Sequence, residues 1–168
     1  MKYTIKHTFN IGADDFWKKV HFDPEFNRAL FEGHLGFTVF KVLSNETAPD
    51  GTIKRKTECA PKVELPGPAK KIFGENTSYV EDGVFDPKTQ RFTVDVIPKV
   101  GADKIKTRVV MWVEKKGDKQ IERVVEVDNT VKVFGIGGML ESFIEKQTRG
   151  NYDAAATFTN KWIQEKGL

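Results

Sequence analysis

The chain has 168 residues, of which 39% are hydrophobic and 30% charged, and its formal net charge is +3. This length and composition are typical of a single globular domain, which we predict over residues 1–168. The 27 lysines and arginines are scattered rather than gathered in a stripe, which argues against a nucleic-acid partner. No run of about 18 apolar residues and no leader-like segment is present, so we expect a cytoplasmic protein.

Residues that carry chemistry are few. Cys59 is the single cysteine, so the chain cannot form an internal disulfide, and its alternating neighbours indicate a small buried residue. His7, His21 and His34 lack the spacing of metal ligands, and no glycine-rich segment has the pattern of a nucleotide-binding loop. We predict no metal and no cofactor.

The first predicted elements are one strand and two short helices. Residues 2–9 alternate between apolar and polar positions, which predicts a half-buried strand. Residues 13–31 carry large apolar side chains at helical spacings. Asp23 and Pro24 interrupt this pattern and favour a second helix start.

Six further strands follow, each with a period of about two residues. Short polar turns of the kind that join antiparallel neighbours separate several of them. We therefore predict an antiparallel meander, which with the first strand makes a sheet of about seven strands. The predicted ranges are 37–43, 53–59, 73–82, 91–97, 105–115 and 120–133.

Residues 138–168 predict one long helix whose inner face has large apolar side chains at both ends and polar or small ones in the middle. Such a face leaves space beneath its centre, so we expect a binding cavity there. The alternatives are a solvated helix packed only at its ends, or two shorter helices broken at Gly150. The face comprises Leu140, Ile144, Gln147, Asn151, Ala155, Phe158 and Trp162.

This order of elements predicts an α+β fold in which a curved antiparallel sheet grips one helix. On that order, and on segments 9–17 (FNIGADDFW) and 133–141 (VFGIGGMLE), the sequence resembles the START and birch-pollen-allergen-like superfamily, with its helix-grip fold, and most closely a bacterial branch of it. The resemblance covers nearly the whole chain. It implies an apolar or amphipathic ligand between sheet and helix, but no particular reaction, since members include lipid carriers, hormone-binding proteins, aromatase/cyclase-like enzymes and chaperone activators.

Polar side chains interrupt the inner faces predicted for three strands: Arg123 and Asn129 in the last, Arg55 in the third and His7 in the first. A buried arginine costs several kcal/mol unless it is paired. The partner is either an internal carboxylate or the anionic head of a ligand.

The candidate internal carboxylates are Glu75 and Glu81. In the ligand alternative, Arg55 or Arg123 anchors a carboxylate or phosphate, and apolar strand residues hold the tail. The complete predicted ligand site comprises His7, Arg55, Phe92, Val94, Val109, Met111, Arg123, Val125, Val127, Gln147, Asn151 and Ala155.

Residues 60–71 contain three prolines and therefore predict no strand. Val63 and Leu65 lie among lysines in this segment, and we expect them to be exposed. The segment is a candidate for a lid, for transient contact with an anionic membrane, or for an ordinary connecting loop.

Three functions are compatible with the sequence. The leading one is a carrier or sensor, without enzymatic activity, of a hydrophobic or amphipathic lipid-like molecule. The second is a cyclase-like or hydrolase-like enzyme whose acid or base is His7, Glu75 or Tyr79, with Arg123 polarising a carbonyl. The third is a protein-interaction module that uses residues 60–71 or the outer sheet face, where we place Trp112; its partner is unknown.

Overall fold

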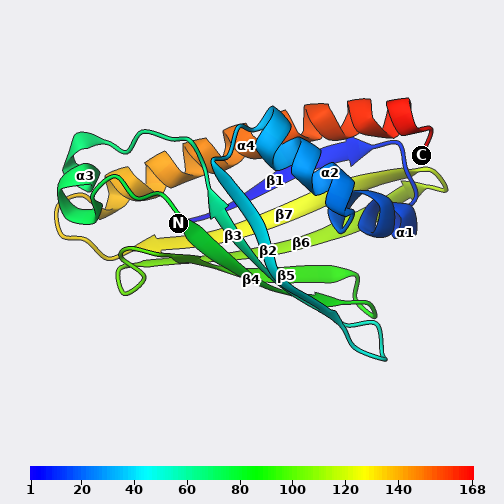
Figure 1. Cartoon of the computed structure of the whole chain (residues 1–168), viewed down its shortest axis with the longest axis horizontal. Coiled ribbons are helices and arrows are strands. Elements are labelled where there is room, and N and C mark those ends of the chain that lie inside the picture. Colours follow the sequence, from blue (N-terminus) through cyan, green and yellow to red (C-terminus); the bar gives the residue numbers. More distant parts are fainter.

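A curved antiparallel sheet of seven strands wraps around one long C-terminal helix in the computed structural model, which describes all of residues 1–168 (Figure 1). The strand order is β1-β7-β6-β5-β4-β3-β2. The elements in chain order are β1 (Lys2–Phe9), α1 (Ala13–Phe16), η1 (Trp17–His21), α2 (Pro24–Arg28), η2 (Ala29–His34), β2 (Val39–Thr47), β3 (Ile53–Ala60), α3 (Gly67–Phe73), β4 (Tyr79–Asp86), β5 (Arg91–Pro98), β6 (Ile105–Gly117), β7 (Gln120–Val131) and α4 (Gly137–Lys166).

This architecture confirms the predicted helix-grip fold. α1 continues into the π-helical turn η1, and α2 continues into η2, so two short helical stretches follow β1 as expected. Asp23 caps the second stretch, because its carboxylate accepts a hydrogen bond from the backbone N–H of Phe26 at 2.7 Å. The meander from β2 to β7 is completed by β1, which pairs antiparallel with β7.

The helix α3 was not predicted, and the strand predicted at 73–82 begins too early. β4 starts only at Tyr79, because the residues before it form α3 and a connecting segment. The prolines indicated a loop, but Pro68 lies in the first turn of α3, where its missing N–H costs no hydrogen bond. Gly74 then ends the helix with a φ of 69°.

The edge strand β2 is also shifted from its predicted range of 37–43. It runs from Val39 to Thr47 and has a bulge between Val42 and Ser44. β2 pairs on one side only, with β3, and most of its side chains are exposed. The alternation of apolar residues is therefore a weak indicator of where the edge strand β2 begins and ends.

The C-terminal helix α4 is continuous, so the alternative with a break at Gly150 is wrong. Gly150 lies in the helix interior with open space beside it. Gly137 opens the helix against the end of β7, where an added Cβ would lie 2.7 Å from the carbonyl oxygen of Val131. The helix ends at Gly167, whose φ is 66°.

Side-chain alternation along the sheet agrees with the predicted faces. Met111 is buried inside, whereas Trp112 lies on the outer face, where the Arg91 guanidinium stacks 4.3 Å from its ring centroid. Cys59 is completely buried, and burial raises the pKa of its thiol. It therefore behaves as a small core residue.

Buried apolar side chains form two clusters. The larger one joins β1, α1, α2 and the sheet to the C-terminal half of α4, and the smaller one consists of Ala69, Phe73, Val131 and Leu140. Both clusters contribute residues to one cavity. None of the helices combines the length and apolar character needed to span a bilayer.

Candidate ligand cavity

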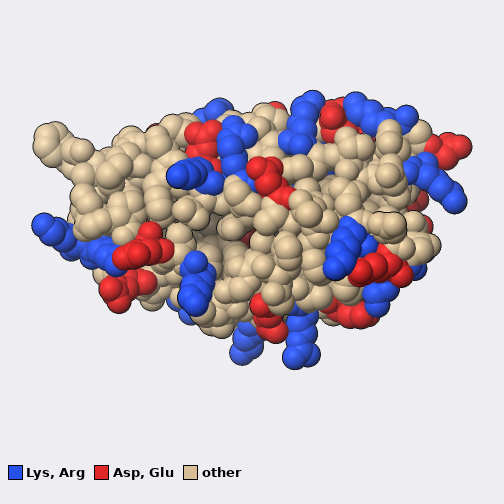
Figure 2. Space-filling view, turned by 90° about the horizontal axis from the view of Figure 1, so that it is seen from above, with Lys and Arg blue, Asp and Glu red and all other residues tan.

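A cavity of about 360 Å³ lies between the inner face of the sheet and α4. Its volume falls within the range of roughly 300–1,000 Å³ that is usual for small-molecule sites. Of the 42 residues that line it, 26 are hydrophobic, so it suits a mainly apolar ligand. The molecular surface is hollowed near the middle of the face that carries α2, α3 and α4 (Figure 2).

Most of the predicted ligand site surrounds this cavity. His7 and Val125 do not line it: Val125 is fully buried in the larger apolar cluster, and His7 lies between β7 and α4. The ten predicted residues that do line it are Arg55, Phe92, Val94, Val109, Met111, Arg123, Val127, Gln147, Asn151 and Ala155.

The centre of α4 faces the cavity through its small and polar side chains. The large residues beyond that centre do not: Phe158 and Trp162 pack against the ring of Phe26, with centroids 5.7 and 5.6 Å away. Instead Thr148, Tyr152 and Thr159 also line the cavity, and the sequence reasoning missed them. Each comes one residue after a member of the predicted face, so these three residues follow the same helical period. The period alone does not determine how the helix is rotated about its axis.

One polar group of the cavity wall surrounds Arg55 on β3. Its Nη1 donates a hydrogen bond of 3.3 Å to the carbonyl oxygen of His21, its one protein acceptor. On neighbouring strands, the Thr57 hydroxyl donates to Oε2 of Glu81 at 3.4 Å. Burial raises the pKa of the Glu81 carboxyl, and Arg55 opposes that rise. No ion pair within 4 Å joins Arg55 to Glu81, so donor capacity of the guanidinium remains free.

The prediction of Glu75 as a second internal carboxylate is wrong. Its side chain is exposed and lies 3.9 Å from Nζ of Lys70, outside the cavity. The reason is that α3 and its connection occupy the residues where a strand was expected. Alternation along a strand therefore did not apply to Glu75, whereas Glu81 does lie on β4.

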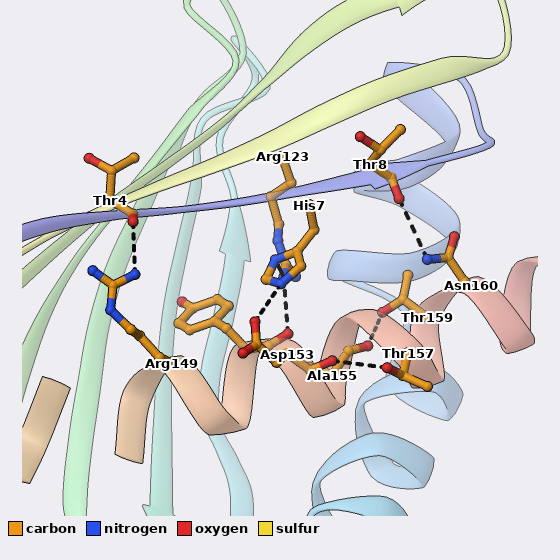
Figure 3. A network of polar contacts seen from close by, with 11 residues as sticks. Thr4, His7, Thr8, Arg123, Arg149, Asp153, Ala155, Thr157, Thr159 and Asn160 are labelled. Carbon is orange, nitrogen blue, oxygen red and sulfur yellow. Dashed lines mark hydrogen bonds and ion pairs between the residues drawn. The ribbon is translucent and has the colours of Figure 1, made fainter. Parts of the chain in front are cut away.

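A second polar group contains Arg123, His7 and Asp153 (Figure 3). The guanidinium of Arg123 lies between the rings of Phe9 and Tyr152, with its Cζ 5.0 Å from each centroid. Its Nη2 donates to Nδ1 of His7 at 2.9 Å, and Nε2 of His7 contacts Oδ1 of Asp153 at 2.8 Å. Burial lowers the pKa of Arg123 to about 10, so it stays cationic at neutral pH.

The cavity wall carries more positive than negative charge. Arg55 and Arg123 are the cationic lining residues, and Glu81 is the one acidic lining residue. His21 also lines the cavity, where burial holds its pKa well below the usual range, and its Nε2 has no hydrogen-bond partner. The wall therefore offers unused donors and a net positive charge to whatever enters.

Residues 60–71 cover part of this cavity. Val63 and Leu65 line it, so the expectation that these side chains are exposed is wrong. The segment remains irregular up to α3, as the prolines predicted. Its apolar side chains face the interior because the sheet and α4 leave space there that water would otherwise fill.

The curved sheet and the long helix across it form the helix-grip fold of START and birch-pollen-allergen-like proteins, and solved structures with the same fold agree. Norcoclaurine synthase from Thalictrum flavum, in complex with dopamine and hydroxybenzaldehyde, has a TM-score of 0.65 at 20% identity, covering 98% of this chain and 88% of that one. The Zhui aromatase/cyclase from Streptomyces sp. R1128 has a TM-score of 0.64 at 11% identity, with coverages of 97% and 96%. A START superfamily protein from Mycobacterium smegmatis has a TM-score of 0.58 at 11% identity, with coverages of 98% and 97%.

The chain belongs to the family described as "Protein of unknown function (DUF2505)", whose model matches residues 4–163. No curated protein matches the sequence. At these low identities the solved structures establish the shared fold alone.

Proposed function

We propose that this protein binds an amphipathic small molecule with one anionic group, and that it acts as a carrier or sensor of that molecule. The observation that carries this proposal is the excess of positive charge in a mainly apolar cavity, where Arg55 and Arg123 face a single acid, Glu81. A ligand carboxylate would supply the missing negative charge.

Arg55 is the better anchor of the two arginines. It makes one hydrogen bond to the protein, at 3.3 Å, and its fork of donors suits a carboxylate. Arg123 is more fully engaged, since two aromatic rings enclose it and Nδ1 of His7 accepts a hydrogen bond from it. Arg123 would then add positive potential from farther along the wall.

The apolar part of the ligand would lie along the sheet. Phe92, Val94, Val109, Met111 and Val127 line the cavity there, opposite α4. Unbranched or aromatic tails both fit this chemistry. Ligand binding by norcoclaurine synthase, which shares the fold, supports the use of such a cavity for small molecules.

Native mass spectrometry of the purified protein, followed by organic extraction, tests the proposal. We expect an adduct that carries an acidic group, that Arg55→Met loses and that Arg91→Met retains. Arg91 is the matched control because its guanidinium stacks on Trp112 outside the cavity. An adduct without an acidic group, held equally by all three proteins, would contradict the proposal.

Proton-transfer catalysis is a second candidate, favoured by Glu81. Its carboxyl lies in the cavity wall with a raised pKa, as a general acid or base requires. Tyr79 also lines the cavity, whereas the other acid–base candidates, His7 and Glu75, do not. Glu81→Gln would then retain affinity for the extracted compound but stop its conversion; conversion at the wild-type rate would exclude this candidate.

A further inference from the structure

Three segments meet at one end of the molecule, which we call the tip: residues 66–74 around α3, residues 98–104 between β5 and β6, and residues 132–140 at the start of α4 (Figure 1). The backbone N–H of Lys132 donates to the carbonyl oxygen of Lys104 at 2.8 Å, which joins the second segment to the third. Phe73 on α3 packs with Leu140 on α4, and its ring lies against Gly101. The tip is therefore one continuous surface.

Apolar side chains protrude from all three segments of the tip. Phe134 is fully exposed, and Ile72, Val100 and Met139 are also exposed. An isolated exposed apolar residue is ordinary on a protein surface. Here a fully exposed phenylalanine is accompanied by three more exposed apolar side chains on adjoining segments. Together they form a surface suited to an apolar environment.

Lysines outnumber acids within the three segments of the tip, which contain five lysines and one acidic residue, Asp103. Three of these lysines pair with acids: Lys104 with Asp103 at 2.8 Å, Lys70 with Glu64 at 2.8 Å, and Lys99 with Glu58. Lys71 and Lys132 are exposed and make no ion pair. In Figure 2, tan side chains project from the same end, and both blue Lys or Arg and red Asp or Glu side chains lie close by.

We infer that the tip docks on the surface of an anionic lipid bilayer. Phe134, Ile72 and Met139 would enter the boundary between headgroups and acyl chains, while Lys71 and Lys132 meet anionic headgroups. The combination favours a bilayer, because its anionic headgroups can meet Lys71 and Lys132 while both lysines stay in water, and its acyl boundary accepts the apolar side chains beside them. This contact shares residues 66–71 with the segment expected to touch a membrane, but its apolar side chains are not Val63 and Leu65, which face the cavity.

The tip is also the wall at one end of the cavity. Phe73 and Leu140 belong to the tip segments, are buried and line the cavity from inside. On docking, only the side chains of the tip would separate an amphipathic ligand in the cavity from the bilayer. The docking inference stands on the tip alone, since it needs neither a ligand nor the cavity arginines.

Vesicle cosedimentation of the full chain tests the inference, using phosphatidylcholine alone and a 70:30 mixture of phosphatidylcholine and phosphatidylglycerol. We expect binding to the mixture and little to phosphatidylcholine alone. Phe134→Ser should weaken binding about tenfold, because burial of one phenylalanine is lost. Ile72→Ser should weaken it too, whereas Leu43→Ser on β2 should not. These two residues are matched, with exposed fractions of 45% and 46%.

A charge comparison completes the test. Lys71→Glu and Lys132→Glu combined should weaken binding to the mixed vesicles about tenfold or more, while Lys88→Glu in the turn between β4 and β5 should leave it unchanged. The inference is overturned if the wild-type protein ignores both vesicles, or if Leu43→Ser and Lys88→Glu weaken binding as much as the tip variants. It is also overturned if Phe134 proves to mediate self-association in light scattering without lipid. Arg55→Met should bind vesicles normally, which separates this inference from the proposed ligand site.

Discussion

Arg123 and His7 lie directly opposite each other on β7 and β1, and Nη2 of Arg123 donates to Nδ1 of His7 at 2.9 Å. Arginine can only donate, so Nδ1 must accept and the proton of the neutral imidazole must sit on Nε2. That proton then points at Oδ1 of Asp153 on α4, 2.8 Å away. A side chain of the helix is thereby linked to an arginine of the cavity wall.

This arrangement requires a neutral His7. Burial lowers the pKa of His7 from 6.5, and the charge of Arg123 lowers it further, while Asp153 opposes both. We expect an NMR titration to give His7 a pKa below 6.5. Asp153→Asn should lower that pKa further, because the opposing carboxylate is removed. A pKa above 6.5 in the wild-type protein would show that His7 is a cation paired with Asp153, and that its bond to Arg123 is lost.

The stability of the protein should decline in mild acid because of His21. Burial and the charges of Arg55 and Arg123 hold its pKa well below 6.5. The unfolded chain therefore binds protons more readily than the folded one, so the free energy of unfolding is greatest above pH 6.5 and falls as the pH drops below it. Urea unfolding at several pH values measures this. His21→Phe should remove much of the decline, and the exposed control His34→Gln should retain it; equal slopes for all three proteins would exclude His21 as the cause.

Gly150→Ala should stabilise the protein by about 0.5–1 kcal/mol, because alanine is the better residue within a helix. The space beside Gly150 is open, so the added methyl group meets no obstacle. Thermal unfolding would report the gain as a higher midpoint. A loss of stability would indicate that α4 is broken or sharply bent at this residue.

The start of α4 offers a matched pair of glycines. A Cβ at Gly137 would lie 2.7 Å from the backbone oxygen of Val131, whereas a Cβ at Gly138 would meet nothing within 4 Å. Gly137→Ala should therefore cost about 1–3 kcal/mol in unfolding free energy, and Gly138→Ala should cost nothing. Equal effects of the two substitutions would show that β7 and α4 are not held in the contact described.

Much of the fold was predictable from the sequence because burial follows a period of two along the inner strands. Arg55 and Arg123 were placed on the cavity wall by that alternation alone. The helix α3 was not predictable in this way, since prolines signal both loops and helix starts. The surroundings of His7 could not be predicted either. Alternation along a strand indicates that a side chain points to the inner face of the sheet, but not whether it meets α4 or the cavity on that face.

The rotation of α4 about its axis could not be predicted from the sequence either. The large side chains of Phe158 and Trp162 suggested the inner face, but they cover Phe26 beside the cavity. Tyr152 instead encloses Arg123 from the helix side. A helix of this composition has apolar residues on more than one side, so only its contacts with α2 and the sheet fix which side faces the cavity.

We propose that the cavity selects an amphipathic molecule by its negative charge. Isothermal titration with dodecanoate and with dodecanol tests it most directly, because the two compounds share a tail and differ in their heads. We expect dodecanoate to bind at least about tenfold more tightly, given that a hydrogen bond to a charged group contributes about 1.5–3 kcal/mol. The preference should disappear in Arg55→Met. Equal affinity of the wild-type protein for the two compounds, or no binding of either, would contradict the claim.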